Sequence, residues 1–165
     1  MKPISIIVAI AEDRGIGKDN NLLCYIPGDL PRFRKITAGH TVVMGRNTFL
    51  SLPGGPLKNR RNIVISDNNA DRFEGCIMAR SIDEALTLCD SHSENFVIGG
   101  ASVYRQFLPL ASKLYLTQVH KVFDADTFFP EIVPGEWVEV SREVPEPDTQ
   151  AGFSYEYIIL QRNNH

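Results

Sequence analysis

The chain has 165 residues, of which 43% are hydrophobic and 22% are charged. These proportions are those of an ordinary globular protein and exclude extensive disorder. The length suits one domain and is too short for two full ones, so we expect residues 1–165 to form a single domain. Seventeen basic and twenty acidic residues give a formal net charge of −3, which argues against a nucleic-acid-binding protein.

Cysteine and histidine usage points away from a metal site. Cys24, Cys76 and Cys89 are widely spaced and form no C-x-x-C pair, and the four histidines show no ligand spacing. We therefore expect no bound metal and free thiols in a reducing compartment. The apolar run at residues 4–11 is too short for a membrane span or a signal peptide. A cytoplasmic protein without a membrane partner is the expectation.

In chain order, short apolar runs alternate with segments of helical spacing. Residues 29–36 place Leu30, Phe33 and Ile36 on one helix face. Ser81 with Glu84 forms a capping box that predicts a helix through residue 88, and another helix follows residues 99–100. The apolar runs are rich in β-branched residues and predict strands buried on both faces, at 4–11, 41–44, 62–66, 96–98 and 114–119.

The tail has a different pattern. Residues 137–140 and 155–160 read as two strands with no helix between them, which is typical of an antiparallel hairpin. The alternating elements before them favour a parallel sheet. The prediction is a single-domain α/β fold with a mixed, mainly parallel central sheet, flanking helices and a C-terminal antiparallel hairpin.

Two glycine turns are candidates for a phosphate site. Gly45 and the pair Gly99-Gly100 each follow a strand and precede a helix, where free backbone N–H groups can bind phosphate. Arg46 opens its helix, where a cation opposes the helix dipole unless an anion binds nearby. Ordinary αβ turns remain the alternative for each, but two such turns in one small domain favour a ligand with several phosphates.

A second group of candidates is polar. Asp29 either caps the helix that follows or points into an apolar pocket beside Leu30 and Phe33, where a carboxylate needs hydrogen-bond donors. Arg60 either belongs to a solvated turn or forms a fork for a carboxylate or phosphate.

A series of short motifs extends these observations from residue 4 to about residue 162. They are Ile7-Val8-Ala9-Ile10-Ala11 with Ile16-Gly17, Pro27-Gly28-Asp29-Leu30 with Phe33, Val43-Met44-Gly45-Arg46-Asn47-Thr48-Phe49, Leu57 with Arg60-Arg61-Asn62-Ile63-Val64-Ile65-Ser66, Val97-Ile98-Gly99-Gly100 with Val103-Tyr104, Leu114-Tyr115-Leu116-Thr117, and Asp126-Thr127 with Phe129-Pro130. Each motif is weak alone, but their order and spacing resemble the dihydrofolate reductase family of the bacterial chromosomal type.

The resemblance implies NADPH-dependent reduction of 7,8-dihydrofolate to tetrahydrofolate, with hydride transfer to C6 and protonation at N5. It also implies that antifolate inhibitors bind and that the protein is a monomer. The implied catalytic residues are Asp29, Thr117, Tyr104 and Leu22. The implied substrate-binding residues are Ile7, Val8, Asp29, Leu30, Phe33, Leu52, Leu57, Arg60, Ile98 and Thr117. The implied cofactor-binding residues are Ala9, Ile16, Gly17, Asn20, Gly45, Arg46, Asn47, Thr48, Ile65, Ser66, Arg80, Gly99, Gly100, Ala101, Ser102, Val103, Tyr104 and Asp126.

The resemblance also implies a mobile lid at residues 12–23, held in its closed state by Asp126. The chain departs from the family at Leu23-Cys24, where most relatives have Pro-Trp, and at Asp67 and Ser102 near the expected phosphates. Two other functions stay open: a related reductase of riboflavin synthesis, and a pterin- or nucleotide-binding module without turnover.

Overall fold

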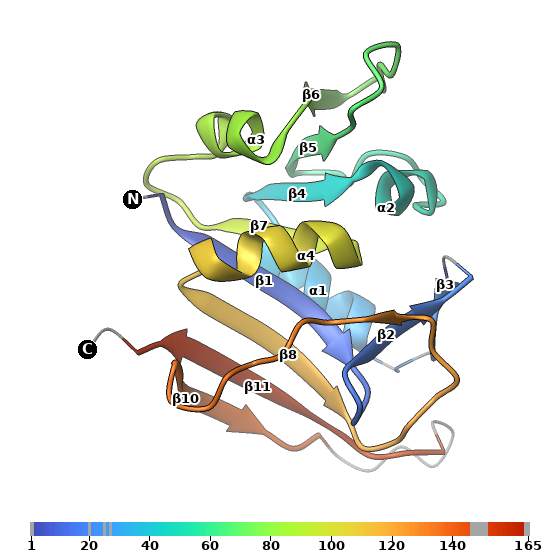
Figure 1. Cartoon of the computed structure of the whole chain (residues 1–165), viewed down its shortest axis with the longest axis vertical. Helices are drawn as coiled ribbons and strands as arrows, with labels where there is room; N and C mark the ends of the chain where they lie inside the picture. Colours follow the sequence, from blue (N-terminus) through green and yellow to red (C-terminus); the bar gives the residue numbers. More distant parts are fainter. Residues whose placement is uncertain (1, 20, 25, 27, 146–151, 164–165) are drawn as a thin grey trace.

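A twisted eight-stranded sheet forms the centre of the protein (Figure 1), in the order β10-β11-β8-β1-β7-β4-β5-β6. The computed structural model describes residues 2–19, 21–24, 26, 28–145 and 152–163. The strands are β1 Ile4–Ile10, β4 Thr41–Gly45, β5 Arg61–Ile65, β6 Cys76–Ala79, β7 Asn95–Gly99, β8 Lys113–Val119, β10 Trp137–Glu143 and β11 Tyr155–Arg162. Each of the seven predicted strands is confirmed, whereas β6 was not predicted from the sequence.

Strand β1 lies between two parallel neighbours, with Ile6 opposite Val97 of β7 and Leu114 of β8. Its alternate residues Ile4, Ile6, Val8 and Ile10 pack into one hydrophobic cluster, while Ile7 packs into another on the opposite face. A strand with both faces covered needs an almost continuous apolar sequence. This is why residues 4–11 could be recognised as a buried strand.

Helices cover both faces of the sheet. They are α1 Asp29–Thr37, α2 Arg46–Leu50, α3 Ile82–Leu88 and α4 Ala101–Phe107, with a 3-10 turn at Leu108–Leu110. Figure 1 shows α4 in front of β1 and the fainter α1 behind it, and their apolar residues Phe107 and Ile36 belong to opposite clusters. None of the helices that the structure describes has the length and apolar character needed to span a membrane.

The capping box of α3 is present in a modified form. Ser81 Oγ accepts a hydrogen bond of 3.0 Å from the Glu84 amide, as predicted. The Glu84 carboxylate, however, accepts from the Arg80 amide at 3.0 Å rather than from that of Ser81. Glu84 therefore accepts from the backbone amide of Arg80, the residue before the N-cap, and this hydrogen bond fixes the Arg80 backbone next to the start of α3.

The C-terminal hairpin is confirmed and makes the sheet mixed. Strands β10 and β11 pair antiparallel, and β11 pairs antiparallel with β8. Part of the connection between them, residues 146–151, lies outside the described residues. The prediction of an α/β fold with a mixed, mainly parallel sheet is therefore correct.

The segment expected as a mobile lid, at residues 12–23, contains two short strands that were not predicted from the sequence. Strands β2 Gly15–Lys18 and β3 Asn21–Leu22 form a small antiparallel sheet with β9 Thr127–Phe128, in the order β3-β2-β9. Gly17 pairs with Leu22 on one side and with Thr127 on the other. Since β9 is more than a hundred residues away, the local sequence could not reveal this pairing.

Candidate functional site

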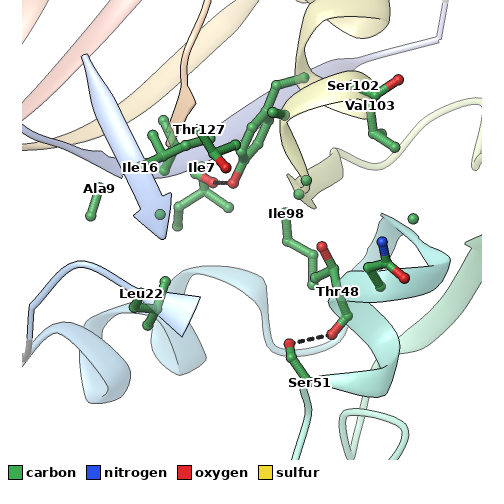
Figure 2. A pocket seen from close by; sticks show the side chains of 18 of the residues that line it. Ile7, Ala9, Ile16, Leu22, Thr48, Ser51, Ile98, Ser102, Val103 and Thr127 are labelled. Carbon is green, nitrogen blue, oxygen red and sulfur yellow. Dashed lines mark hydrogen bonds between the residues drawn. The ribbon is translucent and has the colours of Figure 1, made fainter. Parts of the chain in front are cut away.

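A cavity of about 1820 Å³ opens where the parallel strands β1, β4, β5 and β7 end. Ligands bind in α/β sheets at this edge, outside the carboxyl ends of the strands. Figure 2 shows Ile7, Ile16 and Thr127 along one side of it. Thr48 and Ser51 lie across from them, and Leu22 stands at the rim of the small sheet.

The cavity brings together most of the residues that the sequence singled out. Those that line it are Ile7, Val8, Ala9, Ile16, Gly17, Leu22, Asp29, Leu30, Phe33, Gly45, Arg46, Asn47, Thr48, Leu52, Ile65, Ser66, Arg80, Ile98, Gly99, Gly100, Ala101, Ser102, Val103, Tyr104 and Thr117. Leu57, Arg60 and Asp126 do not line it, and Asn20 lies outside the described residues.

Asp29 is held by a hydrogen bond that crosses the fold. The N-cap of α1 is Gly28, with φ of 81°, so Asp29 is not the N-cap but an acid in the first turn of the helix, which was the other form of the helix-stabilising interpretation. Its Oδ1 accepts from the Thr117 hydroxyl of β8 at 2.9 Å. A left-handed φ at Gly28 suits glycine and lets the chain turn so that Asp29 faces the cavity.

Burial controls the protonation of Asp29. Desolvation raises the pKa of its carboxyl, and this outweighs the Thr117 hydrogen bond and the Arg32 charge, which both lower it. A carboxyl with a raised pKa takes up a proton closer to neutral pH than an exposed one. Such a group can hold or direct a proton in a cleft, which is a signature of a functional acid.

The wall next to Asp29 is apolar, and only the packing of one of its residues, Leu30, differs from the prediction of a shared helix face. Phe33 packs half-buried against the cluster on the α1 face of the sheet, as expected. Leu30 was expected to face the core with it, and instead its side chain is 60% exposed and lines the cavity. Leu30 lies in the first turn of α1, and this turn faces the open cavity rather than other packed side chains.

Leu57 and Arg60 lie beyond this wall. Leu57 packs half-buried in the same cluster as Phe33. The Arg60 guanidinium donates to the Thr37 hydroxyl at 3.0 Å and to the Lys58 carbonyl at 2.9 Å, and it lies 5.9 Å from the Phe33 ring. Because Thr37 is the last residue of α1, Arg60 is anchored at the far end of the helix that carries Asp29.

At the other end of the cavity, glycines allow a close approach of backbone segments. Gly99 has φ of +140°, and a Cβ there would lie 3.0 Å from Thr48 Oγ1. A Cβ at Gly45 would lie 3.1 Å from Val103 Cγ2. This end therefore presents bare backbone at the start of α2 and α4, an arrangement suited to an anionic phosphate chain.

The basic groups at this end already have partners. Arg46 Nε donates to Asp71 Oδ2 at 2.8 Å, and Ser66 Oγ donates to the same oxygen at 2.5 Å. The sequence predicted that Arg46 awaits a bound anion, and did not single out Asp71. The acid that Arg46 contacts is 25 residues away in the chain, and no motif relates the two.

Tyr104 and Asp126 support the two sides of the cavity. The Tyr104 hydroxyl donates to the Ile7 carbonyl at 3.0 Å, and burial raises the pKa of this phenol. Asp126 Oδ2 accepts from the Asp19 amide at 3.0 Å, and the Asp126 amide donates to the Gly17 carbonyl at 3.0 Å. Asp126 thus fixes the end of β2 through Gly17 and Asp19, and it does not line the cavity.

Cys24 lines the cavity and is half-buried. Burial and the nearby Asp29 charge raise the pKa of its thiol. If the NADPH and folate ligands implied by the resemblance bind in this cavity, a thiol-reactive probe should label Cys24 more slowly once NADPH and a folate analogue are added, while Cys76, outside the cavity lining, keeps its rate. We also expect Cys24→Trp to keep turnover within about tenfold, with overpacking costing about 1–3 kcal/mol of stability. Unchanged labelling of Cys24 would place it away from the ligands.

A cleft of this kind, with a buried acid at one end and a glycine cradle at the other, is typical of α/β enzymes that use a phosphate-bearing cofactor. The chain matches the dihydrofolate reductase family model over residues 3–162. It therefore belongs to the dihydrofolate reductase family.

Individual relatives agree. Dihydrofolate reductase of Bacillus subtilis is 42% identical over 161 residues, covering 98% of this chain and 95% of that protein. Dihydrofolate reductase type 3 of Salmonella typhimurium is 40% identical over 159 residues, covering 96% and 98%. The solved structure of Enterococcus faecalis dihydrofolate reductase, complexed with NADP(H) and RAB-propyl, superposes with a TM-score of 0.90 at 32% identity and covers 98% of this chain and 97% of that one.

Proposed function

We propose that this chain reduces 7,8-dihydrofolate to 5,6,7,8-tetrahydrofolate with NADPH, the activity of its family, and so supplies tetrahydrofolate for one-carbon metabolism. The observation that carries the proposal is Asp29, buried in an otherwise apolar part of the cavity and held by Thr117 at 2.9 Å. A protonatable acid in such a site fits a reaction that adds a hydride to C6 and a proton to N5 of a pterin.

In this proposal Asp29 accepts hydrogen bonds from the 2-amino group and N3 of the pterin. The negative charge of its ionised form favours a protonated ring, because an opposite charge nearby stabilises a cation. Thr117 keeps the carboxylate in one orientation, and Phe33 and Ile98 hold the flat ring against it. NADPH supplies the hydride. The residues present fit this cofactor, because the bare backbone at Gly45 and Gly99 leaves room for a pyrophosphate.

We assign Arg60 to the outer end of the substrate. Its guanidinium lies at the Phe33 ring, which lines the cavity, and a planar fork pairs well with the carboxylate of a glutamate tail. Leu57 shares the hydrophobic cluster of Phe33 and shapes this end from behind. Leu22, which is 81% exposed, would cover the nicotinamide when the small sheet closes, with Asp126 holding the lid.

A single assay separates this proposal from its alternatives. Purified protein should deplete the NADPH absorbance band when dihydrofolate is added. A reductase of the riboflavin pathway would instead respond to an aminopyrimidine substrate and leave dihydrofolate intact. A binding module would bind both ligands without any change in absorbance over time.

The Arg46 side chain provides a test of the cofactor end. We expect Arg46→Ala to raise the Michaelis constant for NADPH about tenfold, since a lost charge-assisted partner costs about 1.5–3 kcal/mol. The constant for NADH should change much less, because NADH has no 2′-phosphate. Equal effects on both cofactors would remove Arg46 from the 2′-phosphate site.

The remaining expectations are proposals of the same kind. The described β-strands of the central sheet form one continuous hydrogen-bonded array, which supports a single domain over residues 1–165. Three free cysteines support a reducing, cytoplasmic environment. We propose a monomer that binds antifolate inhibitors in the pterin site; gel filtration with light scattering and competition against dihydrofolate test these two points.

A further inference from the structure

Three of the residues that the resemblance implies for the cofactor make hydrogen bonds within the protein at this end of the cavity. Arg46, Ser66 and Arg80 line the cavity, and each of them donates hydrogen bonds to the segment 66–71 that connects β5 toward β6. The inference drawn from these contacts rests on the proposed function, in which NADPH binds at this end of the cavity.

Ser66 has no second proton to offer. Its side chain is nearly buried, at 4% exposure, and its hydroxyl donates to Asp71 Oδ2 at 2.5 Å. The same oxygen of Ser66 accepts from the Asn68 amide at 3.2 Å. A hydroxyl carries one hydrogen. Ser66 can therefore donate to a phosphate only after it releases Asp71.

Arg46 contacts the same carboxylate oxygen. Its Nε lies 2.8 Å from Asp71 Oδ2, and the Asp71 side chain is only 11% exposed while that of Arg46 is 46% exposed. The pKa of Asp71 is lowered, first by the Ser66 hydroxyl and also by Arg46, so the group is anionic at neutral pH. A carboxylate thus occupies Arg46 Nε and the Ser66 hydroxyl, two donors that a phosphate could use.

Arg80 fixes the position of that carboxylate. Its guanidinium donates to the Asn68 carbonyl at 2.7 Å and to the Asp71 carbonyl at 2.8 Å. These bonds go to backbone atoms, so they order the 66–71 segment whatever side chains it carries. Arg80 therefore holds Asp71 facing Arg46 and Ser66.

We propose that Asp71 is an internal competitor for the 2′-phosphate of NADPH: its carboxylate occupies the Ser66 hydroxyl and the Nε edge of the Arg46 guanidinium, and it must leave before these donors bind the phosphate. Asp71 then sets the preference between NADPH and NADH. It opposes NADPH in two ways, since its hydrogen bonds must break and its charge repels the incoming dianion. NADH carries a hydroxyl at this position and meets neither cost in full.

The test compares the cofactor affinities of Asp71→Asn and the parent protein by fluorescence titration at pH 7 and fixed ionic strength. We expect the dissociation constant of NADPH to fall about three- to tenfold, and that of NADH to stay within about twofold. Adenosine 2′,5′-bisphosphate should tighten as NADPH does, which isolates the adenosine end. The matched control is Glu74→Gln, which removes one negative charge from an exposed side chain three residues along the chain.

Unchanged or weaker NADPH binding in Asp71→Asn overturns the inference, and weaker binding would show that Asp71 orients Arg46 instead. Equal tightening in Glu74→Gln overturns it too, because the effect would then be general electrostatics. In an Arg46→Ala background, the gain from Asp71→Asn should shrink to less than about half of its size in the parent; an undiminished gain contradicts the competition for Arg46.

The inference and the proposed function can fail separately. If Arg46→Ala weakens NADPH binding but Asp71→Asn does not strengthen it, the cofactor site stands and the competitor does not. If Arg46→Ala and Ser66→Ala both leave NADPH affinity unchanged, the 2′-phosphate site lies elsewhere and the inference is overturned, while the proposed function fails only if the parent protein does not oxidise NADPH with dihydrofolate. A thermal melt of each variant shows that the fold is intact, and Asp71→Ala repeats the test without an amide in place of the carboxylate.

Discussion

Replacing Asp29 by Asn is expected to lower turnover at pH 7 by about 10²- to 10⁴-fold, the range attributed to a positioned acid or base. The amide keeps the shape of the side chain and can still accept from Thr117, but it cannot hold a proton or a negative charge. Because the reaction adds a proton to the pterin, the substrate must then be protonated from solution. Steady-state turnover across pH 4–9 measures the effect.

The loss should shrink in acid, where dihydrofolate is protonated without help. Asp83→Asn is the matched control: Asp83 lines the same cavity but is exposed, at the N-terminal end of α3. Its turnover should stay within about twofold of the parent at every pH. Near-normal turnover of Asp29→Asn at pH 7 would reduce Asp29 to a helix-stabilising residue.

Protein stability provides an internal check on this result. The folded-state pKa of Asp29 is raised above its unfolded value, so ionising the group costs folding free energy. The contribution of Asp29 to stability is full below the unfolded pKa and is lost as pH rises through the folded one. Asn does not titrate. Asp29→Asn should therefore melt at or above the parent temperature at pH 7, so that lost activity cannot be ascribed to unfolding.

Gly99→Ala should weaken NADPH binding by about ten- to hundredfold, since a side chain in this backbone region costs on the order of 1–3 kcal/mol. Gly99 has φ of +140°, and the added Cβ would lie 3.0 Å from Thr48 Oγ1, inside the cradle at the start of α2 and α4. The chain can relieve the contact only by moving α2 or the turn itself. Titration with NADPH and with dihydrofolate measures the change.

Gly135→Ala is the control that separates the effect of backbone strain from an effect on the cofactor site. Gly135 also has a left-handed φ, +92°, but a Cβ there meets nothing within 4 Å, and the residue does not line the cavity. It should lower the melting temperature and keep NADPH affinity. Dihydrofolate binding to Gly99→Ala should also be nearly normal. If Gly99→Ala binds NADPH as tightly as the parent does, the cradle does not hold the cofactor.

Much of the architecture could be predicted from local sequence. A strand covered on both faces requires a run such as residues 4–11, and each face of β1 meets its own cluster. The Ser81–Glu84 spacing predicted the start of α3 for an equally local reason. The glycine turns were recognisable because backbone close to a ligand excludes a Cβ.

The sequence did not show which polar groups would meet. It left Asp29 with two interpretations, and the decision came from Thr117, which is 88 residues away. It predicted a loop at residues 12–23, whose strands depend on β9. It predicted that Arg46 binds a phosphate but did not indicate that Arg46 Nε would donate to Asp71.

These cases have one physical cause. Burial of apolar side chains repeats along a strand or a helix and leaves a period in the sequence. A hydrogen bond between Asp29 and Thr117, or between Arg46 and Asp71, joins single residues on different elements and leaves no period. The sequence alone therefore determined seven of the eight strands of the central sheet, the helices and the kinds of groups at the cleft. Only the tertiary structure decided which carboxylate faces the cavity and which one already holds the cation expected to bind the cofactor.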